Sequence, residues 1–448
     1  MTAGRNVFQS DPGTLVNGPF SSVGPLVAGD LRPGADIVLQ AGVGSSGPDY
    51  AALAARYLDP ANLAQPGVPL ADQPGKVAKI YEAELSTWLK GRFGFQGTVE
   101  QAIAFFDALP VEQRAIFLRQ VHFAELREGG REYNDPNSMR FNSYLRGREA
   151  IAMLFPETDA NGNPTERKGD ITIFGGSSIR TNFGGNIQML APNGQIIVGV
   201  EGTVPPSSAG IITQGEGDIQ MYSKGSVLLG LSRIMTTFGG DILIWSAEGD
   251  INAGRGAKST IVYTPARRVY DDYGGVTLSP NVPSSGAGIA TLNPIPGIPA
   301  GNVDLIAPLG TIDAGEAGIR SSGNVNLAAL QILSAANIQA QGNTTGVPTI
   351  HAPNIGGLTE ASNTAGAAQQ VAKPAQTGTA EQPSIIIVEF LGFGGGDGVA
   401  PNSNDDERSR KMQGRQTYNT NGAVQVLGHG DLTDQEKEVL NDEEKRKL

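Results

Sequence analysis

The 448-residue sequence contains no cysteine, which excludes disulfide bonds and thiolate metal sites. Charged residues make up only 17% of the chain, unlike the charge-rich composition of disordered proteins. The net charge of −12 at pH 7 disfavours a nucleic-acid partner, which a basic surface would attract. No window approaches 18 consecutive apolar residues, so the sequence predicts no membrane-spanning helix. An apolar signal-peptide core is also lacking after Met1, so any export signal is expected in a longer precursor.

Glycine, by contrast, is abundant at 61 residues, and it punctuates an internal repeat. The stretches Thr181–Glu201 and Thr236–Gly256 align without a gap, and Gly301–Gly318 is a third copy. Self-similarity of this kind indicates a repeat architecture.

Each copy is built from a smaller unit: a glycine, usually an aspartate or asparagine, and two apolar residues that flank one intervening residue. Alternate side chains of a strand point to opposite faces, so the two apolar residues are expected inward and the intervening residue outward. The apolar pairs are Ile171/Ile173, Ile187/Met189, Ile196/Val198, Ile219/Met221, Val227/Leu229, Ile242/Ile244, Ile251/Ala253, Val303/Leu305, Ile312/Ala314, Val325/Leu327 and Ile338/Ala340.

The interval between corner glycines predicts how these short strands associate. Gly194, Gly217 and Gly240 follow one another every 23 residues. A constant return of about two dozen residues, holding two or three short strands, is typical of a right-handed parallel β-helix. We therefore predict a mainly β fold, a right-handed parallel β-helix or solenoid, with an inserted α-helical subdomain. An antiparallel sandwich is the rival fold, but it would not need a constant return.

A helical periodicity interrupts the repeats before residue 158. Apolar residues recur there at helical spacing, which predicts several helices with a core of their own. Thr98 and Gln101 are predicted to form a capping box at the start of one helix. Pro110 suits the first position of the next helix, which Gly129 and Gly130 are expected to end.

A strand edge left bare at the start of the chain suggests that the chain was cut from a larger protein. Changes in periodicity and composition divide the chain into five parts. The predicted parts are the end of preceding β-helix coils (1–48), the inserted helical subdomain (49–158), the β-helix (169–350) with a loop insertion at 255–300, a flexible linker (351–383), and a strand-like run with a charged tail (384–448).

Carboxylates of the repeats are the first candidates for catalysis, because enzymes that cleave polysaccharides align carboxylates on one face of parallel strands. Most of them, however, directly follow a corner glycine, where an aspartate side chain accepts hydrogen bonds from nearby backbone N–H groups. We interpret those as corner residues, and Asp304 and Asp313 as outward residues in the middle of a strand. An acid–base pair would need environments that separate the two pKa values. The six candidate carboxylates are Asp170, Asp218, Asp241, Asp250, Asp304 and Asp313.

The sequence gives little evidence of a metal-binding site. Gly394–Gly398 resembles one turn of a calcium-binding roll, but a single copy lacks the neighbouring turn that shares each ion. The histidines His122, His351 and His429 have no partners at ligand spacing, and His122 with Glu125 is interpreted as a pair on a helix surface. The sequence therefore predicts no catalytic, cofactor-binding or metal-ligating residue, and no cofactor.

The insertion at 255–300 offers the best candidates for contact with a partner. Tyrosine and arginine combine a large apolar body with a polar end, which favours them at binding surfaces. A loop folded back on the strands is the alternative interpretation. The candidate contact residues are Arg267, Arg268, Tyr270, Asp271, Asp272 and Tyr273.

The stretch Leu231–Gly256 (LSRIMTTFGGDILIWSAEGDINAGRG) resembles the C-terminal region of large bacterial filamentous haemagglutinin family exoproteins, and Ala35–Leu58 is similar to the same region. The resemblance implies a long right-handed β-helical fibre, export through an outer-membrane transporter of the two-partner type, and roles in adhesion or biofilm formation. It carries over no binding residue, and the receptor or glycan stays unidentified.

These inferences lead to a non-enzymatic adhesin fragment that is secreted or held at the cell surface in association with the outer membrane, with the β-helix as a rigid spacer. A β-helical carbohydrate-active enzyme, either a polysaccharide lyase or a hydrolase, is the first alternative. A C-terminal module that caps the fibre or presents a toxin is the second.

Overall fold

A computed structural model of the protein describes residues 2–3, 7–9, 20–21, 34–43, 47–158, 162, 165, 168–174, 177–181, 184–199, 209–256, 267–270, 276–279, 286–293 and 297–348. All of these lie within Met1–Asn354, the first of the two units into which the chain divides. The predicted linker and tail, 351–448, lie outside the described residues.

The larger of two parallel sheets contains twelve strands, and β17 pairs with three of them. Its strands are β1 (Val7–Gln9), β3 (Ile37–Gln40), β4 (Ile171–Ile173), β6 (Ile187–Ala191), β7 (Ile196–Val198), β9 (Ile219–Ser223), β10 (Val227–Leu229), β12 (Ile242–Ser246), β13 (Ile251–Asn252), β17 (Val303–Asp313), β19 (Val325–Leu333) and β21 (Thr344–Thr345).

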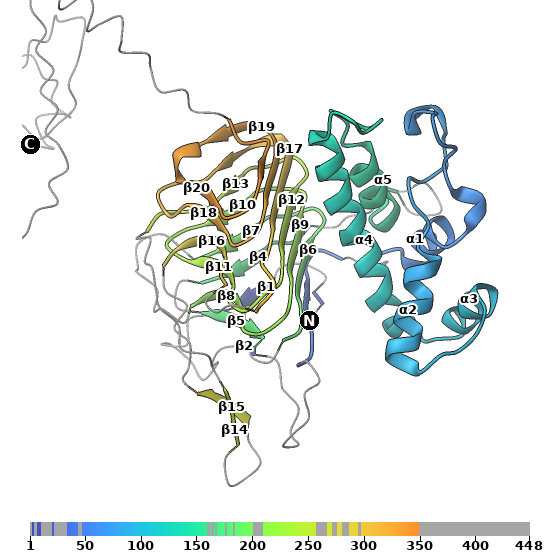
Figure 1. Cartoon of the computed structure of the whole chain (residues 1–448), viewed down its shortest axis with the longest axis horizontal. Coiled ribbons are helices and arrows are strands. Elements are labelled where there is room, and N and C mark those ends of the chain that lie inside the picture. Colours follow the sequence, from blue (N-terminus) through green and yellow to red (C-terminus); the bar gives the residue numbers. More distant parts are fainter. Residues whose placement is uncertain are drawn as a thin grey trace, which may run out of the picture. The chain divides into compact units, whose positions relative to one another are not determined.

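The smaller sheet has seven strands, and Figure 1 shows it facing the larger one. Its strands are β2 (Phe20–Ser21), β5 (Ser178–Thr181), β8 (Gly210–Thr213), β11 (Arg233–Thr236), β16 (Gly288–Thr291), β18 (Ile319–Ser321) and β20 (Ile338–Ala340). A separate antiparallel hairpin joins β14 (Arg267–Tyr270) to β15 (Val276–Ser279).

The short apolar-pair units pair in parallel and in register, as the strand assignment requires. Ile242 of β12 lies opposite Ile219 of β9, and Ile219 lies opposite Ile187 of β6. The inward residues of these strands form one apolar core in which most side chains are fully buried. This core is almost wholly aliphatic because each short strand contributes isoleucine, valine, leucine, methionine or alanine.

The predicted fold class is wrong, because the described residues form a mixed α/β structure in which two parallel sheets are accompanied by five α-helices. One long strand, β17, pairs with β12 through Val303–Ile306 and with β13 through Ile312–Asp313. The β-helix prediction placed the strands that pair with β12 and with β13 on separate faces. Because β17 pairs with both, these strands belong to one sheet that bends back on itself. The repeat pattern specifies parallel pairing and inward side chains, which several parallel architectures share, so it could not single out the solenoid.

The helices form a layer along the outer face of β6, β9, β12 and β17 (Figure 1). They are α1 (Tyr50–Tyr57), α2 (Glu82–Phe93), α3 (Val99–Asp107), α4 (Val111–Asn134) and α5 (Leu145–Leu154), with short 3₁₀ turns at Pro60–Asn62, Leu70–Asp72 and Ala335–Asn337. The predicted capping box at Thr98 and Gln101 is confirmed. Among the described residues, no helix is long and apolar enough to cross a bilayer.

The expectation of a separate helical core is wrong. Leu190, Tyr222, Trp245 and Ile306 point outward from the sheet and belong to the same buried cluster as the helix side chains. Trp245 is fully buried there. The central strands of the larger sheet therefore have an apolar core on each face.

Gly129 and Gly130 do not end α4, which continues to Asn134. A Cβ on Gly130 would lie 2.4 Å from Ile306, and one on Gly129 would lie 2.9 Å from the backbone nitrogen of Gly147. Both glycines are needed because α4 approaches β17 and α5 too closely for a side chain.

Candidate functional site

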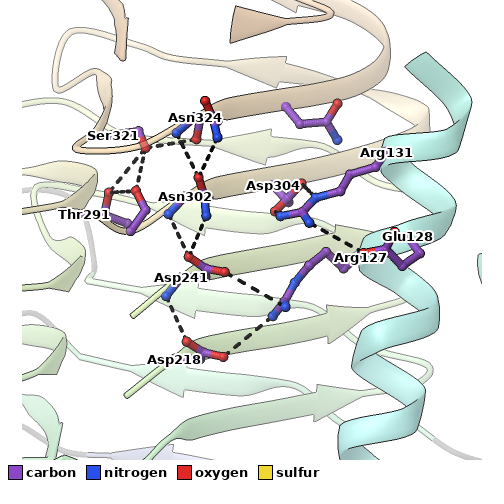
Figure 2. Close-up of polar contacts among 12 residues, drawn as sticks. Arg127, Glu128, Arg131, Asp218, Asp241, Thr291, Asn302, Asp304, Ser321 and Asn324 are labelled. Atoms are coloured by element: carbon purple, nitrogen blue, oxygen red, sulfur yellow. Dashed lines mark hydrogen bonds and ion pairs between the residues drawn. The ribbon is translucent and has the colours of Figure 1, made fainter. Parts of the chain in front are cut away.

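A polar seam runs between α4 and the larger sheet, and Figure 2 shows its central part. One helical turn rises about 5.4 Å and neighbouring strands lie about 4.8 Å apart, so successive turns of a helix laid across a sheet can meet successive strands. Arg119, Arg127, Arg131 and Asn134 lie on one side of α4 and reach polar groups on strands or at their start.

The best-defined contact in the seam is between Arg131 and Asp304, the residue expected to point outward from the middle of its strand. The Nε and Nη2 atoms of Arg131 donate to the two carboxylate oxygens of Asp304 at 3.0 and 2.9 Å. The Asp304 side chain is only 1% exposed. Burial raises the pKa of Asp304 above its usual value, and the Arg131 guanidinium offsets part of that rise. Planar two-point pairing of this kind fixes orientation as well as charge.

Arg127 lies between two further carboxylates of the repeats (Figure 2). Its Nη2 is 3.6 Å from Asp218, and its Nη1 is 4.0 Å from Asp241. Burial raises the pKa of Asp218, whereas the Asp241 backbone N–H and Arg127 lower it. These contacts are longer than direct hydrogen bonds, so Arg127 acts mainly as a positive charge that offsets two partly buried acids.

The aspartates and asparagines that directly precede successive strands, all but Asp36 following a corner glycine, form a ladder of side-chain to backbone hydrogen bonds. In each step the side-chain oxygen of one aspartate or asparagine accepts the backbone N–H of its counterpart on the adjacent strand, at 2.7–2.9 Å. The corner role is therefore correct in kind, but the bonds join neighbouring strands rather than nearby positions in the chain. In order, the ladder contains Asp36, Asn186, Asp218, Asp241, Asn302, Asn324 and Asn343.

The three remaining candidate carboxylates also accept hydrogen bonds. Asp170 accepts the Gln195 backbone N–H at 2.9 Å, and Asp250 accepts that of Thr311 at 2.7 Å. Asp313 accepts the backbone N–H of Gly315 and the hydroxyl of Ser334, both at 2.8 Å. The structure thus gives each of the six carboxylates a backbone or arginine partner.

A groove of about 540 Å³ opens where the seam meets the last strands. Its wall includes Arg131, Asn134 and Asp135 of α4 and its C-terminal end, together with Asn302, Asn324 and Asn343 of the ladder. Amide and guanidinium groups dominate this wall, so its chemistry suits hydrogen bonding to a polar ligand better than nucleophilic attack.

The interpretation of His122 and Glu125 as a surface pair is wrong, because both side chains are fully buried. Glu125 accepts two hydrogen bonds from Arg146, at 2.9 and 2.6 Å, and one from the Tyr81 hydroxyl at 2.5 Å. His122 is surrounded by aromatic rings, including Phe155 and Tyr222. Burial lowers the pKa of His122 to about 3, although the Ala150 backbone opposes this, so its imidazole is neutral at physiological pH.

Of the predicted contact residues, Arg267, Arg268 and Tyr270 belong to β14, whose backbone alone is described. Asp271, Asp272 and Tyr273 lie outside the described residues, as do His351, His429 and Gly394–Gly398. A contact role for these six residues therefore stays a prediction. Within the described ranges, no group of three or more histidine, aspartate or glutamate side chains is placed to hold a metal ion.

Sequence reasoning missed Arg127 and Arg131, because no residue type or motif distinguishes them from ordinary surface arginines of a helix. A signal was present in their spacing. Arg119, Arg127 and Arg131 recur at multiples of four residues, which places them on one side of a helix. Outward polar residues of the strands, such as Asp304, were the matching half of that signal.

Comparison with protein-family models gives a match in the C-terminal half of the described residues. Residues 239–349 match the family model described as filamentous haemagglutinin family outer membrane protein. No curated protein and no solved structure matches the chain. The matched residues include β12, β17 and β19, which lie under α4.

Proposed function

We propose, because residues 239–349 match the family model described as filamentous haemagglutinin family outer membrane protein, that the chain is a non-enzymatic scaffold of a secreted or surface-held adhesin. In this role the two sheets and the helical layer form a stiff body that carries contact surfaces for attachment or biofilm formation. Export through an outer-membrane transporter of the two-partner type is part of the proposal and rests on the family resemblance.

The proposal rests on the partners of the repeat carboxylates, which are backbone N–H groups and arginine side chains. Asp218 and Asp241 combine ladder hydrogen bonds with contacts to Arg127, and Asp304 pairs with Arg131. These contacts fasten strands to one another and to α4. A general acid–base pair needs two carboxyl groups free to exchange protons with a substrate. Groups committed to backbone and guanidinium donors support a structural role.

Attachment can be measured with beads coated with the full chain and perfused over bacterial or host cell layers. We expect beads carrying the folded chain to be retained, and beads carrying the heat-unfolded chain to wash off. A strain producing the whole precursor should also lose surface attachment when residues 239–349 are deleted, with precursor release measured as the control for export.

A carbohydrate-active enzyme is the second candidate, favoured by the groove that Asp304 and Asp135 line. The full chain is incubated with acidic and neutral polysaccharides, and reducing ends and unsaturated products are measured. Product formation that Asp304→Asn abolishes in a folded variant would replace the scaffold proposal, whereas bead retention without product formation would support it.

A further inference from the structure

The hairpin of α2 and α3 carries a cluster of aromatic side chains, here called the aromatic tip: Phe93 and Phe105, which are exposed, and Trp88 and Phe95, which are half-buried. The Phe93 and Phe105 rings lie 5.8 Å apart, and the Phe95 and Phe105 rings 5.4 Å apart. Phe93 is 37% exposed and Phe105 is 38% exposed. Large apolar side chains gathered at an accessible position mark an interaction surface, whereas single exposed ones are ordinary.

The connection between the two helices holds the aromatic tip in shape. Gly94 ends α2 in the left-handed conformation, with φ of 67°, and Thr98 caps α3. A Cβ on Gly97 would lie 2.4 Å from the Phe95 ring, so that ring rests directly on the glycine backbone. A partner that binds the tip would therefore meet rings that are already in place, which lowers the entropic cost of binding.

The last turn of α2, beside Phe93, is basic, although the whole chain carries a net charge of −12 and α3 carries the exposed acids Glu100 and Asp107. Between Glu84 and Glu100 the only charged residues are Lys90 and Arg92. Both are exposed in the last turn of α2, and the Arg92 guanidinium lies 5.8 Å from the Trp88 ring centre. Accessible aromatic rings next to basic side chains match the chemistry of an anionic lipid surface.

We propose that the aromatic tip docks on the surface of an anionic phospholipid bilayer. Phe93 and Phe105 enter the boundary between headgroups and acyl chains, and Lys90 and Arg92 face the lipid phosphates. The proposal goes beyond the adhesin scaffold and does not depend on it, because it would hold for any function of the sheets.

The test is co-sedimentation of the full chain with vesicles of phosphatidylcholine, with and without phosphatidylglycerol. The wild type is expected to bind the anionic vesicles. The double variant Phe93→Ser/Phe105→Ser should weaken that binding by about tenfold or more, because two accessible rings no longer enter the interface. Lys90→Gln/Arg92→Gln should weaken binding to anionic vesicles alone, and added salt should have the same effect as this variant.

Leu330→Ser is the matched control, since Leu330 is 77% exposed on β19, outside the aromatic tip. It should bind as the wild type does, and circular dichroism should show all variants folded. Absence of wild-type binding to anionic vesicles would overturn the proposal, as would an equal loss in Leu330→Ser. Sedimentation velocity tests whether a second copy of the chain binds the tip instead. Self-association that Phe93→Ser/Phe105→Ser abolishes would make the tip a protein interface and overturn the proposal.

Discussion

The two faces of the larger sheet are buried by different kinds of side chains, although they belong to the same strands. On β12, Ile244 enters the core between the sheets, whereas the adjacent Trp245 enters the core beneath the helices. The inner core is aliphatic and follows from alternation alone. The outer core mixes aromatic rings with the polar seam, and its partners lie far apart in the chain, with Arg131 and Asp304 separated by 173 residues. A regular repeat can thus specify one face of a sheet and leave the other to be matched by unrelated helices.

Changes at the corners should have the largest effect, because both cores depend on them. Gly240 has φ of +93°, and a Cβ there would lie 2.1 Å from the carbonyl oxygen of Gly217. Gly240→Ala is expected to lower the free energy of unfolding by more than about 4 kcal/mol, measured by urea denaturation. Gly91→Ala is the control, since nothing lies within 4 Å of its Cβ position, and it should raise stability by about 0.5–1 kcal/mol.

Truncation of the outer core comes next. Trp245→Ala should cost about 3–5 kcal/mol, and Ile244→Ala about 2–5 kcal/mol, since both side chains are fully buried. Trp245→Ala should lower together the melting temperatures of the helical signal at 222 nm and of the strand signal in the infrared amide I band. Loss of stability in the sheets with unchanged helix melting would separate the two regions and contradict the shared outer core.

Removal of an arginine from the seam should have a smaller but specific effect. Arg131→Leu leaves Asp304 buried without its cation, which should cost about 2–3 kcal/mol. Because the penalty comes from the unpaired carboxylate, adding Asp304→Leu should restore part of the loss. A double-mutant cycle with no coupling between the two positions would show that the pair does not fasten α4.

The buried imidazole predicts a pH dependence. The pKa of His122 falls from 6.5 to about 3 on folding, so below pH 6.5 the unfolded chain binds a proton that the folded chain does not. Stability from this residue is complete above pH 6.5 and is lost progressively as pH falls toward 3. His122→Leu should reduce the slope of unfolding free energy against pH in that window, and an unchanged slope would assign the dependence to other groups.

The smallest effect is expected at the surface. Lys224 and Glu248 lie 3.5 Å apart with both side chains well exposed. Lys224→Gln should change the free energy of unfolding by less than about 0.5 kcal/mol, against the larger loss for Arg131→Leu. A loss equal to that of Arg131→Leu would mean that burial does not explain the difference between the two pairs.

The sequence predicts the inner face of the larger sheet better than its outer face. The pairs Ile187/Met189 and Ile242/Ile244 revealed parallel strands and the inner core, because alternation is a local property. The outer core was not predictable from alternation, since Tyr222 and Trp245 read as ordinary outward residues until the helices cover them. Gly129 and Gly130 were misinterpreted as a helix end, because composition cannot distinguish a stop from a close approach to Ile306. The pairing of Arg131 with Asp304 required the three-dimensional arrangement of α4 and β17.

Native-state hydrogen exchange measured by mass spectrometry tests the central claim most directly, that helices and sheets unfold as one unit through the outer face. Backbone amides of α4 and of β12 are expected to share one free energy of opening, equal to that of global unfolding, and Arg131→Leu should lower both equally. Exchange of α4 at a much lower free energy than β12, with only α4 responding to Arg131→Leu, would contradict the account.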